Sequence, residues 1–210
     1  MSTDPINNNQ STESKILEAA EAEFLLKGYA GARTTAIAEA AGVTHAMLHY
    51  YFRTKDKLFD KIIESKMDTL RDIMLASLSD PSIPLFEKLT TAIETHLEFI
   101  AANPDLPGFM IREVLSRPDK RPVMVGKLKC HAPQVVASLQ GQIDEYAAKG
   151  LCRRVDAAML MLDIVSLNIF PFMASAMINP LLGGMMEDRD AFLAARKKDN
   201  VETIMRKLKP

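Results

Sequence analysis

One stretch, Thr34–Phe59 (TTAIAEAAGVTHAMLHYYFRTKDKLF), constrains what this chain can fold into more than any other part of it. Ile37, Ala38 and Ala41 recur at helical spacing on one face, which predicts a short helix. Gly42 follows directly, where helices often end in a left-handed residue that glycine adopts at little steric cost. The chain is therefore expected to stop one helix and change direction at Gly42.

A second short helix is predicted immediately after this turn. Thr44 is a good N-cap residue, and Met47, Leu48 and Phe52 are candidates for the inward face of that helix. Two short helices joined by a tight glycine turn are typical of a helix-turn-helix, whose second helix enters the major groove of DNA.

The rest of the sequence also favours helices. Gly28 is expected to end a helix that begins near Thr12, and Thr54 to cap a long helix that runs to about Leu78. Further helical patterns cover residues 85–102, 106–115, 123–149, 155–178 and 188–208, the third of them interrupted by Pro133. No strand-like alternation occurs in the sequence, so the predicted fold class is all-α. The expected organisation is a disordered segment over residues 1–11, a helix-turn-helix domain over 12–54 and a larger helical domain over 55–210.

Net charge, cysteine positions and the lack of known site motifs limit the functions that this sequence predicts. The formal net charge of −1 predicts weak bulk attraction to nucleic acid, so placed contacts would have to supply most of any DNA affinity. Cys130 and Cys152 form no zinc or disulfide pattern, and we expect plain thiols in a reducing cytoplasm. Residues 1–15 lack the apolar run of a signal peptide. The sequence contains no catalytic motif and no metal-binding or phosphate-binding motif, so no enzyme activity, metal or cofactor is expected.

A set of residues falls in register with one known family: Gly28-Tyr29, Ile37-Ala38, Ala41-Gly42-Val43, Leu48, Tyr51-Phe52, Lys55 and Leu58-Phe59. Over residues 12–60 the sequence therefore resembles the N-terminal domain of the TetR family of bacterial transcriptional regulators. The resemblance implies an all-helical, two-domain homodimeric repressor whose larger domain binds a ligand and dimerises through its last two long helices. Such a protein binds a palindromic double-stranded DNA operator and releases it when a small molecule enters the larger domain.

The resemblance also implies which residues meet DNA. Tyr51 and Lys55 match positions that touch phosphate, while the reading helix supplies most of the other contacts. Ala46 stands where the family usually has glycine, His49 where it has tyrosine, and Arg33 where it has a small hydroxyl residue. The full set of predicted DNA contacts is Arg33, Thr34, Thr35, Thr44, His45, Ala46, Met47, His49, Tyr50, Tyr51 and Lys55.

A pocket for a small apolar or amphipathic effector is a further expectation. Flexible methionine thioethers suit an adaptable cavity, although methionine and phenylalanine at helical spacing suit an ordinary core equally well. Asp163 interrupts an apolar run, so it is expected to pair internally, to lie at the dimer interface or to contact the ligand. The candidate ligand contacts are His96, Phe99, Phe109, Met110, Glu113, Met124, His131, Met159, Asp163 and Phe170.

Alternative functions remain open. The protein could regulate DNA without a small-molecule ligand, or it could be a helical ligand carrier that has lost DNA binding. Residues 157–178 are long and apolar enough to suggest a membrane span, but Asp163 carries an insertion penalty of ~2.5–3.5 kcal/mol at such a position. We therefore expect this segment to be a packed helix, and no membrane partner.

Overall fold

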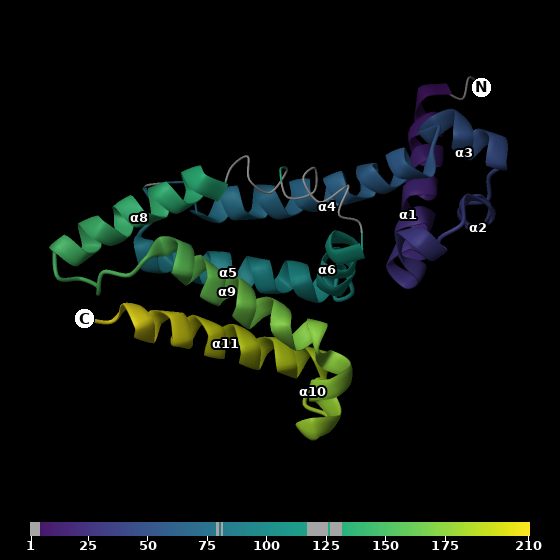
Figure 1. Ribbon diagram of the computed structural model, residues 1–210. Helices are drawn as coiled ribbons and strands as arrows, with labels where there is room; N and C mark the ends of the chain where they lie inside the picture. Colours follow the sequence, from purple (N-terminus) through teal and green to yellow (C-terminus); the bar gives the residue numbers. More distant parts are fainter. Residues whose placement is uncertain (1–4, 79, 81, 117–125, 127–131) are drawn as a thin grey trace. The chain divides into compact units, whose positions relative to one another are not determined.

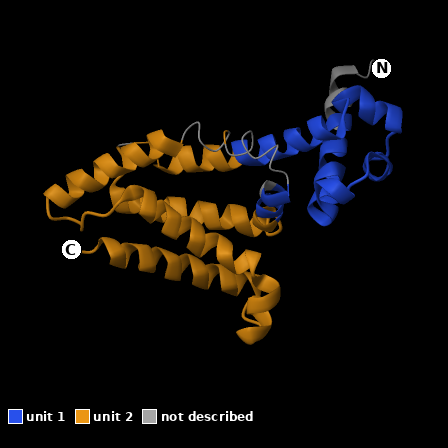
Figure 2. Cartoon of the chain, viewed as in Figure 1, with its two compact units in different colours: residues 1–68, 109–124 blue, residues 69–108, 125–210 orange. Residues whose placement is uncertain are grey.

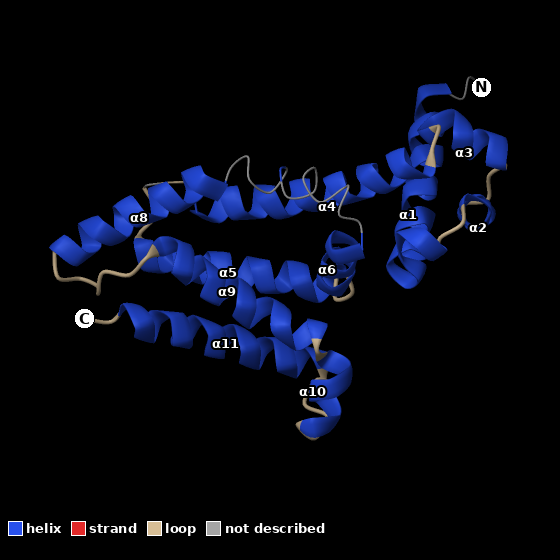
Figure 3. Ribbon diagram, in the orientation of Figure 1, coloured by secondary structure: helices blue, strands red, loops and turns tan. Residues whose placement is uncertain are grey.

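The structure is a computed structural model that describes residues 5–78, 80, 82–116, 126 and 132–210 (Figure 1). Every regular element in these ranges is a helix, which confirms the all-α prediction (Figure 3). In chain order the helices are α1 (Pro5–Gly31), α2 (Thr34–Ala40), α3 (His45–Phe52), α4 (Lys55–Leu78), α5 (Leu85–Ala102), α6 (Leu106–Ser116), α8 (Ala132–Ala148), α9 (Ala157–Met173), α10 (Ser175–Leu181) and α11 (Arg189–Leu208).

The chain forms two compact units (Figure 2). Unit 1 comprises Met1–Asp68 and Phe109–Met124, and unit 2 comprises Thr69–Gly108 and Val125–Pro210. Both α4 and α6 therefore contribute residues to each unit. The division into functional domains after residue 54 remains a prediction, because compact units need not coincide with functional domains.

Unit 1 begins with a helix that differs from the expected one at both ends. α1 starts at Pro5, so it includes part of the segment that was predicted to be disordered. Gly28 interrupts α1 rather than ending it, since its φ of 67° and ψ of 175° are non-helical while the helix continues to Gly31. Inside unit 1, Phe24, Phe59 and Leu58 are among the most deeply buried side chains. The rings of Phe24 and Phe59 meet edge to face with 5.2 Å between centroids, which packs α1 against the first half of α4.

Unit 2 is built on α5, α9 and α11, which run alongside one another (Figure 1). Leucine and isoleucine side chains from these helices and from α8 fill its core. Three buried polar residues also meet there: Asn168 Nδ2 donates to Ile93 O and lies 3.0 Å from His96 Nδ1, while Asn200 Nδ2 donates to Asn168 Oδ1 at 2.7 Å. These contacts tie α9 to both α5 and α11.

The segment predicted as one helix over residues 155–178 is two helices, so that prediction is wrong in this detail. α9 and α10 meet at Ala174 with a bend of 79°. Pro171 lies in the last turn of α9, where it removes a backbone donor and its ring crowds the preceding turn. In the described residues no single helix is long and apolar enough to cross a membrane, and only this bent pair meets that test jointly.

The remaining long helices match their predictions closely. α5 covers Leu85–Ala102, the predicted range, and Asp188 caps α11 by accepting a hydrogen bond from Ala191 N–H at 3.0 Å. α8 begins at Ala132, so Pro133 occupies its first turn, where the missing N–H costs little. Most of residues 123–131, where the sequence pattern also predicted helix, lie outside the described residues.

Candidate nucleic-acid interface

The turn between α2 and α3 has the conformation that the sequence predicts. Gly42 has a φ of 67°. Its N–H donates to Glu39 O at 3.0 Å, and Val43 N–H donates to Ala38 O at 2.9 Å. These two bonds satisfy carbonyls that the end of α2 would otherwise leave unpaired, which is the Schellman pattern. Backbone hydrogen bonds therefore fix the point where the chain leaves α2.

α3 buries one side and exposes the other. Leu48 and Phe52 are buried, as predicted. Thr44 caps the helix, because its Oγ1 accepts a hydrogen bond from Met47 N–H at 3.2 Å. Met47 is 42% exposed, so its assignment to the inward face is wrong: it directly precedes buried Leu48 and points to a different side of the helix. The exposed side carries Thr44, His45, Ala46, Met47, His49 and Tyr50.

Neighbouring groups hold the two histidines of α3. His45 Nε2 lies 3.0 Å from Thr34 Oγ1, which links α3 to the first residue of α2. His49 Nδ1 lies 2.9 Å from Arg53 O and must carry the proton, because a carbonyl oxygen only accepts. The two imidazole rings meet edge to face with 4.6 Å between centroids. Tyr50 is 70% exposed, compared with 42% for Met47.

The start of α4 completes this surface. Thr54 caps α4 by accepting a hydrogen bond from Lys57 N–H at 3.2 Å, and the first N–H groups of a helix favour phosphate. The Lys55 ammonium lies 4.5 Å from the centre of the Tyr29 ring, a cation–π distance. Arg53 and Lys57 are exposed beside it. The positive charge of this region is thus concentrated between the end of α3 and the start of α4.

The carboxylate of Glu23 supports the other end of this surface, next to the start of α2. A hydrogen bond from Lys27 lowers the pKa of Glu23, and the Arg33 backbone N–H donates to the same side chain at 3.2 Å. The positive charge of Lys55 also lowers the pKa of Glu23. Glu23 therefore fixes the backbone at Arg33, directly before α2.

Every predicted DNA contact lies in unit 1, on α2, on α3 or in the segments that flank them. Thr34, Tyr51 and Lys55 are half-buried, and the other members of the predicted set are exposed. The predicted set omits two exposed bases within two residues of Lys55: Arg53, which the sequence already places beside the reading helix, and Lys57. A search for basic residues near the capping residue of α4 adds Lys57.

The predicted ligand contacts are divided between the two units. Phe109, Met110 and Glu113 belong to unit 1. His96, Phe99, Met159, Asp163 and Phe170 belong to unit 2, and Met124 and His131 lie outside the described residues.

Within unit 2 these candidates face different surroundings. His96 and Phe99 are buried, whereas Met159 and Phe170 are exposed on α9. Asp163 forms an ion pair with Lys207 of α11, so the internal pairing foreseen for it is present. The candidates of unit 2 therefore occupy both buried and exposed positions, and the predicted ligand contacts stay a prediction.

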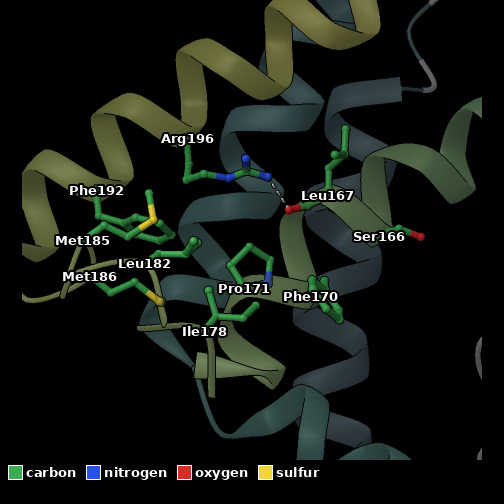
Figure 4. A pocket seen from close by; sticks show the side chains of 10 residues that line it. All are labelled: Ser166, Leu167, Phe170, Pro171, Ile178, Leu182, Met185, Met186, Phe192 and Arg196. Atoms are coloured by element: carbon green, nitrogen blue, oxygen red, sulfur yellow. Dashed lines mark hydrogen bonds between the residues drawn. The ribbon is translucent and has the colours of Figure 1, made fainter. Parts of the chain in front are cut away.

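A groove of about 440 Å³ lies between α9, α10 and α11 (Figure 4). Among the predicted ligand contacts that the structure describes, Phe170 lines this groove. Arg196 is the charged member of an otherwise largely apolar wall, and its Nη2 donates to Leu167 O at 3.0 Å. The groove is lined by Ser166, Leu167, Phe170, Pro171, Ile178, Leu182, Met185, Met186, Phe192 and Arg196.

Comparisons with known proteins agree with this architecture. Residues 16–62 match the family model described as bacterial regulatory proteins of the tetR family. The chain is 24% identical over 178 residues to the uncharacterized HTH-type transcriptional regulator YdgC of Bacillus subtilis, an alignment that covers 82% of this chain and 91% of YdgC.

Two further comparisons cover different parts of the chain. It is 33% identical over 97 residues to the HTH-type transcriptional repressor SCO4008 of Streptomyces coelicolor, which is 46% of each protein. Its fold resembles that of the transcriptional regulator FadR from Bacillus subtilis, solved in complex with stearoyl-CoA, with a TM-score of 0.60 at 18% identity over 91% of this chain and 97% of FadR.

A capped, outward-facing α3 after a glycine turn defines a helix-turn-helix DNA-binding protein. The chain belongs to the TetR family of bacterial transcriptional regulators. Its relatives are regulators of transcription rather than enzymes, in agreement with the expectation from the sequence.

Proposed function

We propose that this TetR-family protein is a homodimeric repressor of a palindromic operator and that a small apolar or amphipathic effector releases it from DNA. The exposed side of α3 carries this proposal. Its polar aromatic side chains stand between a capped N-terminus and a basic segment, which is the arrangement that base contacts in the major groove and phosphate contacts beside it require.

An apolar face of α9 supports the homodimer. Met159, Leu162, Phe170 and Met173 are each at least 45% exposed and share one helical stripe with Ser166. Exposed apolar stripes of this kind mark surfaces that a partner covers, and a second copy of the chain would cover it symmetrically. The two α3 helices of such a dimer must lie about 34–36 Å apart, or a multiple of that distance, to enter successive major grooves.

The groove beside α10 supports an amphipathic effector. Its apolar wall suits a hydrocarbon chain, and buried Arg196 Nε has no hydrogen-bond partner among the described residues. An acidic head group would match that guanidinium. FadR, whose fold this chain shares, binds stearoyl-CoA, a molecule with both an acyl chain and anionic groups.

Selection of DNA from a random pool by the purified protein tests the DNA-binding part. We expect a palindrome whose binding weakens steeply as salt rises. Tyr50→Ala should reduce affinity for that palindrome by about tenfold or more and affect random DNA little, since base contacts are worth roughly 1–3 kcal/mol. Tyr50→Phe is the matched control for the hydroxyl group. Equal affinity of the unaltered protein for the palindrome and for random DNA would refute the proposal.

Thermal unfolding with palmitate, and with hexadecanol as its uncharged counterpart, tests the effector part. A rise in Tm with palmitate that Arg196→Ala abolishes would support the groove as the site. Stabilisation by a ligand in a protein that binds no operator would favour the helical carrier. Operator binding without stabilisation by either compound would favour a regulator that responds to no such ligand.

A further inference from the structure

Two residues of α6 dock on the corner that precedes the helix-turn-helix, more than 80 residues earlier in the chain, and a third packs against α4. The Phe109 ring lies 5.8 Å from the Phe59 ring, and Arg112 Nη2 donates to Leu25 O at 3.3 Å. Glu113, which is 3% exposed, accepts a hydrogen bond from Tyr29 N–H at 3.1 Å through Oε1. All of these residues belong to unit 1.

The two polar contacts replace one hydrogen bond that α1 lacks. In an unbroken helix, Tyr29 N–H would donate to Leu25 O, four residues earlier. Gly28 has non-helical angles directly before Tyr29, so this bond is interrupted. Glu113 accepts from the freed donor, and Arg112 donates to the freed acceptor. The side chains of adjacent α6 residues thus satisfy both halves of the missing backbone bond.

A side chain at the break would crowd the Glu113 carboxylate. A Cβ atom at Gly28 would lie 3.0 Å from Glu113 Oε1, and the φ of 67° disfavours other residues there independently. Gly28 is therefore the residue that lets the carboxylate of α6 reach the backbone of α1.

Tyr29 connects this contact to the DNA-facing surface. Its ring lies parallel to that of Phe24 at 6.2 Å and edge to face with that of Phe59 at 5.1 Å. The Tyr29 ring also contacts the Lys55 ammonium, which lies 4.5 Å from the ring centre. The orientation of Tyr29 consequently sets where the Lys55 charge is held at the start of α4.

We propose that Arg112 and Glu113 are positioning residues for DNA binding: they replace the backbone hydrogen bond lost at Gly28, hold Tyr29 in place and so orient Lys55 toward phosphate. The role of Lys55 rests on the proposed function, whereas the bond from Tyr29 to Glu113 does not. Neither α6 residue contacts DNA in this scheme. Their effect on affinity is transmitted through Tyr29 and Lys55.

Amide hydrogen exchange tests the contact in the absence of DNA. In Glu113→Ala the Tyr29 amide should exchange at least about tenfold faster than in the unaltered protein, because its acceptor is gone. Glu113→Gln retains an oxygen acceptor of the same reach and should restore most of the protection. Glu94→Ala, a glutamate of α5 in unit 2, is the control. Unchanged exchange in Glu113→Ala would overturn the proposal.

A double-mutant cycle on the selected operator tests the positioning role. Glu113→Ala and Lys55→Ala should each weaken operator binding by about tenfold and reduce the slope of log affinity against log salt concentration by about one. The double variant should bind the operator as tightly as Lys55→Ala alone. Additive losses would overturn the role assigned to Glu113. Normal operator binding by Lys55→Ala would refute the phosphate contact of Lys55. The amide exchange experiment would then still decide whether Glu113 holds the Tyr29 N–H.

Arg112→Ala keeps the test open if Glu113→Ala does not fold, because Arg112 is largely exposed and its removal leaves the core unchanged. It should weaken operator binding by about threefold, and this loss should vanish in the Lys55→Ala background. A loss that persists undiminished in that background would contradict positioning through Lys55.

Discussion

Arg196 donates a hydrogen bond to the backbone oxygen of Leu167, 3.0 Å away. Leu167 precedes Pro171 by four residues, so the helix itself offers no N–H to this carbonyl. A side chain of α11 therefore satisfies an acceptor that a proline frees in α9. Arg112 does the same for Leu25 O at the glycine break in α1. In both units, a neighbouring helix compensates for the place where a long helix is interrupted.

We predict that Arg196→Ala lowers the free energy of unfolding by about 1–2 kcal/mol, because Leu167 O loses its charged donor. Urea unfolding monitored by circular dichroism measures the change. Asp199→Ala is the control: it removes the exposed ion-pair partner of Arg196 and should cost less than about 0.5 kcal/mol.

Pro171→Ala provides the second arm of that experiment. It restores an N–H that can reach Leu167 O, so Arg196→Ala should cost less in this background than in the unaltered protein. Equal costs in the two backgrounds would show that Arg196 stabilises the fold for some other reason, such as its packing against the groove.

The buried His96 predicts a loss of stability in mild acid. Burial lowers the pKa of His96 from 6.5 to about 4. Below pH 6.5 the unfolded chain binds a proton at this residue that the folded chain does not. The free energy of unfolding should therefore be unaffected by His96 above about pH 7 and should fall progressively between pH 6.5 and 4, by on the order of 3 kcal/mol in total. Urea unfolding across this range measures the slope.

The matched variant is His96→Asn, which retains a hydrogen-bonding group beside Asn168 but does not titrate. The carboxyl groups whose pKa is lowered by neighbours, such as Asp144 beside Arg154, are common to both proteins and cancel in the difference. If the difference in stability between the two proteins is constant from pH 7 to 4, His96 is not held neutral by burial.

Local signals made most helices predictable from the sequence. Glycine and proline positions, capping threonines and the 3.6-residue apolar period depend on neighbours within a few residues, so Gly42, Thr44 and Thr54 have the predicted roles. The break at Ala174 escaped prediction because apolar periodicity continues across Pro171 and does not report a bend.

The ligand contacts were not predictable in the same way. Methionine and phenylalanine content indicates an apolar interior without saying which residues share a cavity. Glu113 shows the difficulty, since it was grouped with ligand contacts but accepts a bond from Tyr29, 84 residues away. Contacts at such separations depend on tertiary packing, and one sequence contains no direct record of it.

Loss of the cap on α3 should weaken the reading helix. Thr44→Ala removes the oxygen that accepts from Met47 N–H, and we expect the free energy of unfolding to fall by about 1 kcal/mol. Thr44→Ser restores the acceptor and should recover most of that loss. Thermal unfolding of the three proteins measures it. A Thr44→Ser variant as unstable as Thr44→Ala would indicate that the threonine methyl group, rather than the cap, is what matters.

Leu162→Glu tests the proposed dimer within the exposed α9 stripe. Leu162 is 55% exposed, so the charge should not disturb the folded subunit, yet two copies facing each other across a two-fold axis would bury like charges. We expect the variant to be monomeric by sedimentation, with unchanged helical content and at least about tenfold weaker operator binding, because a single α3 cannot span both half-sites. Lys198→Glu, at an exposed site on the charged side of α11, should remain dimeric. A dimer that persists in Leu162→Glu would move the interface away from this face of α9.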